Sequence, residues 1–122
     1  MTTNTSRYLI VPMMVLSLTV LLAPANAQMT CPTTDDMLSH LPTCTTHHYH
    51  SGDINNKGVY QSLLAKANNA VALNDQGNSE AAVNLLNALI NELEAQRGNH
   101  VDANAADMLI MHAEMAIDEI SG

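Results

Sequence analysis

The C-terminal half of the chain repeats its apolar residues at helical spacing. Spacings of three and four positions are typical of a helix with one buried face. They predict two amphipathic helices, Ser79–Gln96 and Asp102–Ile120. The apolar stripe of the first consists of Val83, Leu85, Leu86, Leu89, Ile90 and Leu93. That of the second, which is richer in alanine, consists of Ala106, Leu109, Ile110, Ala113, Ala116, Ile117 and Ile120.

Polar residues mark where these two helices begin and end. Either Asn78 or Ser79 suits the N-cap of the first helix, and Asp102 suits that of the second, because their side-chain oxygens accept from free N–H groups. Gly98 follows Arg97 and provides the usual glycine stop. The short connection over residues 98–101 makes the two helices antiparallel neighbours.

A third amphipathic helix is predicted over Lys57–Asn74, capped by Asn55 or Asn56. Residues 45–52 are predicted to be helical as well, and to end at Gly52. Phe and Trp are absent from the chain, so the core has to be aliphatic. An aliphatic core rich in alanine favours closely packed helices over a sheet. The fold class predicted is therefore all-α, a small up-and-down bundle of about four helices.

The N-terminus has the pattern of an export signal. Residues 9–23 are almost entirely apolar, and Ala25-Asn26-Ala27 supplies the small residues of a cleavage site. This predicts a signal peptide over residues 1–27 and a secreted or periplasmic product. An uncleaved anchor is the alternative, but the run contains Pro12 and is shorter than the roughly 20 residues that span a bilayer. No membrane span is expected after cleavage.

Cys31 and Cys44 are the only cysteines, and export favours a disulfide between them. Free or metal-binding thiols are the alternative. A single helix containing both would hold their Cα atoms about 20 Å apart, whereas a disulfide needs about 4.4–6.8 Å. Because Pro42 disfavours a helix interior, we expect a short helix around Thr34–His40 and a turn at residues 41–42. The disulfide would then pin the front end of the bundle.

All twelve acidic residues follow residue 27. The basic residues in this part of the chain are Lys57, Lys66 and Arg97. This balance argues against nucleic acid and anionic membrane surfaces as partners. It is compatible with a cation, a basic partner or simple solubility.

His47, His48 and His50 form the sharpest local cluster. Imidazole is a common ligand for zinc, copper and nickel, and reduction would add Cys44 to the candidate ligands. The alternative is a polar helix end, where histidine also suits the helix dipole. A zinc site needs three or four converging ligands, so both interpretations stay open.

Met108, Met111 and Met115 share one side of the last predicted helix, with His112 beside them. Thioethers bind copper(I), but methionine more often fills irregular helical cores, and core packing is the favoured interpretation. The sequence contains no nucleophile elbow and no phosphate-binding glycine loop. We therefore predict no catalytic residues, no cofactor and no enzyme.

Several short segments together resemble a known family: Ser62-Leu63-Leu64-Ala65-Lys66, Gly77-Asn78, Ala81-Ala82, Asn87-Ala88, Ile90-Asn91, Ala95-Gln96, Leu109-Ile110 and Ala113. The resemblance is to the FIMAH domain, a small helical module of bacterial secreted and surface proteins, and covers about residues 54–120. It implies an extracellular accessory or interaction module without catalytic residues. The chain departs from the family at Leu89, where phenylalanine is usual, and in the Cys- and His-containing segment upstream.

These observations predict a signal peptide (1–27), a disulfide-containing, His-rich helical cap (28–53) and a three-helix FIMAH-like module (54–122). The predicted function is that of a secreted, non-enzymatic interaction or structural module. It would act through contact with an unidentified protein partner or through self-association. The alternative is an exported metal-binding protein that uses His47, His48 and His50 for zinc, copper or nickel.

Overall fold

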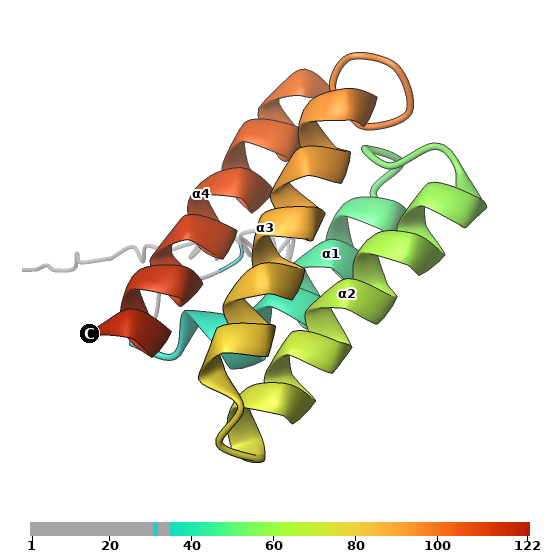
Figure 1. Cartoon of the computed structure of the whole chain (residues 1–122). Helices are drawn as coiled ribbons and strands as arrows, with labels where there is room; N and C mark the ends of the chain where they lie inside the picture. Colours follow the sequence, from blue (N-terminus) through green and yellow to red (C-terminus); the bar gives the residue numbers. More distant parts are fainter. Residues whose placement is uncertain (1–30, 32–34) are drawn as a thin grey trace, which may run out of the picture.

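A computed structural model describes residue 31 and residues 35–122 of the chain; the predicted signal peptide lies outside the described residues. Four helices follow one another along the chain: α1 (Met37–His50), α2 (Lys57–Asp75), α3 (Ser79–Gln96) and α4 (Ala103–Ser121). They run alternately up and down (Figure 1). The predicted all-α bundle of about four helices is confirmed.

Each helix packs against two others around a single core. α1 and α3 both contact α2 and α4, so the four helices form a closed ring of neighbours. The large side chains buried most completely at its centre are mainly aliphatic: Met37, Leu41, Ile54, Leu63, Leu86, Leu89, Leu93, Leu109 and Val101. Buried alanines on α2, α3 and α4 fill the space between them and let the helix axes approach closely.

The predicted helix ends agree closely with the structure. The bounds of α3 match the prediction, α2 ends one residue later than predicted, and α4 both begins and ends one residue later. The Asp102 carboxylate caps α4 and accepts from the backbone N–H of Asn104 at 2.9 Å. The Asn56 side chain caps α2 and accepts from the N–H of Val59 at 3.0 Å. Local capping chemistry therefore determines where these helices begin.

The two loops at one end of the bundle pair with each other. Ile54 and Val101 form an isolated antiparallel bridge, and both side chains are buried. The N–H of Asn55 donates to the His100 carbonyl at 2.9 Å, and the N–H of Asp102 donates to the Asp53 carbonyl at 2.7 Å. Since buried backbone groups need partners, this pairing lets the loops close the core.

The predicted turn at residues 41–42 is wrong, because α1 continues through Pro42. Proline inside a helix costs about 3 kcal/mol. The side chains that precede the proline are buried: Met37, Leu38 and Leu41. Burial of each stabilises the fold by about 1.5–3 kcal/mol. Burial of this continuous face outweighs the lost hydrogen bond. The disulfide still forms, because Cys31 precedes α1 instead of lying within it.

Among the described residues, no helix has both the length and the apolar character required to cross a membrane.

Candidate functional site

The three histidines of the predicted metal cluster lie at the end of α1 and differ in burial. His48 is buried, His47 is half-buried and His50 is exposed. The rings of His47 and His48 lie edge to face with centroids 5.6 Å apart. Within the described part of the chain, the ring nitrogens of these three histidines do not converge as the ligands of one metal ion would. Metal binding by His47, His48 and His50 stays a prediction.

His48 is held in place by the loop that follows α1. Its Nδ1 lies 2.8 Å from Oδ2 of Asp53, and the Ser51 hydroxyl donates to the same oxygen at 2.8 Å. The hydrogen bond from His48 is the main cause of the lowered pKa of Asp53, with a smaller contribution from Ser51. Because an ionised carboxylate only accepts, Nδ1 carries the proton. Nε2 of His48 is buried without a hydrogen-bond partner.

The predicted disulfide between Cys31 and Cys44 is present. The two Cα atoms are 5.4 Å apart, within the range that a disulfide requires. Cys44 is buried on the inner face of α1, and Cys31 packs against the core from the segment before the helix. The bridge therefore ties the chain upstream of α1 to the middle of that helix.

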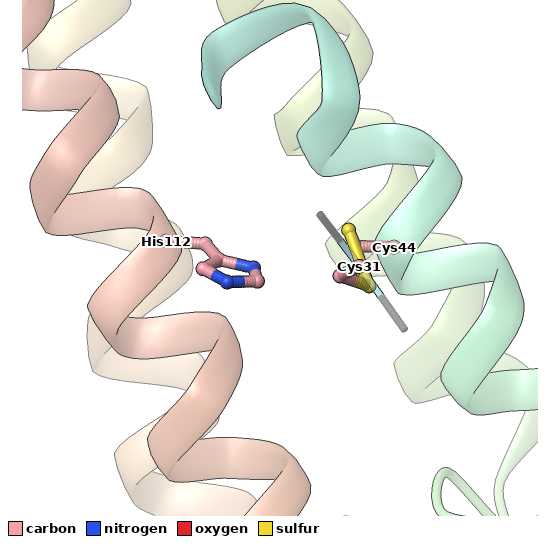
Figure 2. A group of neighbouring side chains, drawn as sticks. All are labelled: Cys31, Cys44 and His112. Carbon is pink, nitrogen blue, oxygen red and sulfur yellow. A yellow bond between two sulfur atoms is a disulfide. The ribbon is translucent and has the colours of Figure 1, made fainter. Parts of the chain in front are cut away.

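His112 projects from α4 towards this disulfide (Figure 2). A ring nitrogen of His112 and the two sulfur atoms all lie within 4.8 Å of one another. The structure thus brings together residues of three separate segments: the chain before α1, the middle of α1, and α4. We call Cys31, Cys44 and His112 the buried cluster.

His112 is almost completely buried, with 1% of its surface exposed, and its Nδ1 has no hydrogen-bond partner. An unsatisfied buried polar group costs about 1–3 kcal/mol. Burial, and secondarily the nearby His48, lowers the pKa of His112 from its ordinary value of 6.5. The ring is therefore neutral at pH 7. The inward position of His112 was not predicted. The sequence does contain a signal for it, because His112 lies three residues after Leu109 and four before Ala116, which is the spacing of the buried face of α4.

A shallow polar hollow lies where the two paired loops meet, lined in part by Asp53, Asn55, Asn99 and Asp102. Its side chains already have structural roles. The Asp102 carboxylate caps α4, and Asp53 binds His48 and Ser51. Asn55 Oδ1 lies 3.1 Å from Nδ1 of His100. The hollow is accounted for by turn and cap chemistry.

The prediction that Met108, Met111 and Met115 fill the core is wrong. These residues are 39%, 44% and 38% exposed, and they are the exposed large hydrophobic side chains of the described part of the chain. The inner face of α4 is taken instead by leucine, histidine and alanine. We call the three exposed residues the methionine surface.

The geometry defines a four-helix module with a buried disulfide–histidine cluster and an apolar outer face on α4. A family model for the FIMAH domain matches residues 38–118. The chain therefore belongs to the FIMAH domain family, as the resemblance implied, and the match includes α1 in addition to the three later helices. The division into a cap over residues 28–53 and a separate module stays a prediction. Comparison with curated proteins and with solved structures found no match.

Proposed function

We propose that this FIMAH domain is a non-enzymatic protein-binding module that acts outside the cytoplasm and contacts its partner through the methionine surface of α4. Family membership supports the general class, a bacterial surface or secreted module. The observation that carries the specific proposal is the exposure of Met108, Met111 and Met115 on one side of one helix.

The spacing of the methionine surface suits a contact with another chain. The three residues occupy positions i, i+3 and i+7 of α4, so they line one side of the helix over two turns. Methionine side chains are flexible and polarisable, and they are common at surfaces that adapt to a partner. Contiguous exposed apolar side chains bordered by polar residues are typical of interaction sites.

Charge determines the kind of partner. Exposed acidic residues are interleaved with the methionines, including Asp107, Glu114 and Asp118. Asp107 is paired with Arg97, whereas Glu114 and Asp118 are in none of the ion pairs found among the described residues. A second copy would bring the same acidic border to the contact. The proposed partner is therefore a protein that presents apolar side chains bordered by lysine or arginine.

A fluorescent amphipathic peptide of leucine and lysine is a suitable probe for this surface. Its binding is followed by anisotropy at physiological salt, for the wild type and for the triple variant M108Q/M111Q/M115Q. Met→Gln leaves the net charge unchanged, so it removes the apolar contact and retains the attraction between charges. We expect binding to weaken about tenfold or more in the variant, because it loses the central apolar contacts.

The matched control is A65Q/N68Q/A72Q, which places three glutamines at the same spacing on the exposed side of α2. This variant should bind like the wild type. Equal binding by all three proteins would contradict the proposal. Sedimentation velocity should show that the wild type is a monomer. If the wild type is instead a dimer that dissociates in the Met→Gln variant, the partner at the methionine surface is a second copy of this chain, and the proposal of a different partner protein is wrong.

A further inference from the structure

Beyond the proposed function, and independently of it, we propose that the buried cluster is a redox-gated metal site. When the disulfide is reduced, Cys31, Cys44 and His112 bind one Zn²⁺, and His48 supplies the fourth ligand. In the oxidised protein the two sulfurs are bonded to each other and the site is closed.

The geometry of the cluster is close to what zinc requires. In a tetrahedral site with Zn–S of about 2.3 Å and Zn–N of about 2.0 Å, neighbouring ligand atoms lie roughly 3.3–3.8 Å apart. The sulfurs of Cys31 and Cys44 and a nitrogen of His112 already lie within 4.8 Å of one another. Among the described residues, this is the only such group of three or more His, Cys, Asp and Glu side chains. These three ligands therefore need only small side-chain movements after reduction, whereas His48, which lies outside this group, has to move further.

Both histidines have a nitrogen available for a metal. Nδ1 of His112 and Nε2 of His48 are buried and have no hydrogen-bond partner. His48 follows Cys44 by four residues, so the two share the inner face of α1. The Asp53 carboxylate holds the proton of His48 on Nδ1, the arrangement by which outer carboxylates commonly orient zinc-binding histidines. Burial also keeps His112 in the neutral form that binds metals.

The charge of the proposed complex suits its surroundings. Two thiolates neutralise the two positive charges of Zn²⁺, and two neutral imidazoles add none, so the complete site is uncharged. An uncharged complex avoids the penalty of an unpaired charge in the interior.

Each chemical step balances. A dithiol reductant attacks the Cys31 sulfur, which belongs to a half-buried residue, and Cys44 leaves as the thiolate. The second thiol of the reductant then releases Cys31, so that the protein gains two electrons and two protons while the reductant becomes a disulfide. Zinc subsequently displaces the two thiol protons to solvent and binds both thiolates.

The test is a zinc titration against a chromophoric chelator, performed on the full chain as the expressing cells process it. A phosphine is the reductant, because it does not compete for zinc as a dithiol would. The reduced wild type should bind one equivalent, and the oxidised protein should bind on the order of a thousandfold more weakly. His112→Leu should weaken binding at least about a hundredfold, and His48→Leu about tenfold or more.

The variant H47A/H50A is the matched control, because it removes two histidines of α1 and leaves the buried cluster intact. Its affinity should equal that of the reduced wild type. Loss of binding in this variant would overturn the proposal, as would equal affinities for the oxidised and reduced proteins. So would wild-type affinity in either His→Leu variant.

Cobalt(II) provides a readout that does not depend on any variant folding correctly. The reduced wild type with one equivalent of Co²⁺ should show thiolate-to-cobalt charge-transfer absorption together with the visible bands of a tetrahedral site. A spectrum without thiolate charge transfer would overturn the assignment.

Discussion

At the scale of single residues, His112 connects burial with a response to acid. In the folded protein its pKa lies below the ordinary value of 6.5, because the ring is buried on α4 and lies near His48 of α1. The unfolded chain exposes the ring and protonates it near 6.5. Between these two pKa values the unfolded state binds more protons, so acid favours unfolding.

The first prediction follows from this difference. The stabilising effect of neutral His112 should be complete above about pH 6.5 and should be lost progressively as the pH falls towards the pKa of the folded state. The free energy of unfolding, measured with denaturant between pH 7.5 and about pH 5, should therefore decrease. Much of this dependence of the free energy of unfolding on pH should disappear in His112→Leu. An unchanged slope in that variant would contradict the prediction.

Asp53 titrates in a lower range. Its folded-state pKa is lowered from 3.8, first by the hydrogen bond from His48 and then by Ser51. Its contribution to stability is therefore complete above the unfolded value and is lost as the pH falls below it. Asp53→Asn should reduce the loss of stability below about pH 4, as measured by acid unfolding, and should leave the slope between pH 5 and 7 largely unchanged.

At the scale of the helices, α4 has two faces with different roles. Leu109 lies on the face packed against α1 and α3, whereas Met111 lies on the open face. Leu109→Ala should lower the free energy of unfolding by about 2–5 kcal/mol, because it leaves a cavity in the core. Met111→Ala should change it by no more than about 0.5 kcal/mol. Equal losses in the two variants would show that the faces have been assigned incorrectly.

Helix ends were predictable where local chemistry decides them. Asp102 and Asn56 are the N-caps of α4 and α2, as their sequence positions indicated. The course of α1 was not predictable, because proline is a local signal against a helix and the burial that outweighs it is tertiary. The same limit applies to α4, whose apolar residues occupy more than one side. Its alanine-rich side packs inward, and this leaves the methionines outside.

At the scale of the whole molecule, the disulfide joins the segment before α1 to the bundle. Its formation was predictable from the two cysteines and the export pattern. The approach of His112 was not, since α1 and α4 are far apart in sequence and become neighbours only when the ring of helices closes.

Removing the disulfide should therefore destabilise the folded state. Closing a loop of this length restricts the unfolded chain and stabilises the native state by about 3 kcal/mol. The variant C31A/C44A, and the reduced wild type with a chelator present, should each lose stability of that order in denaturant unfolding. Full stability in both would contradict a structural role for the bridge.

The central claim, that α4 presents its methionine surface to a partner, is tested most directly by NMR of protein labelled with ¹³C at the methionine methyl groups. The leucine–lysine peptide is added at physiological salt. The methyl signals of Met108, Met111 and Met115 should shift in a saturable way, and by more than that of Met37, which is buried but lines a hollow next to Met115. Peptide binding that leaves the three α4 signals unmoved would contradict the account.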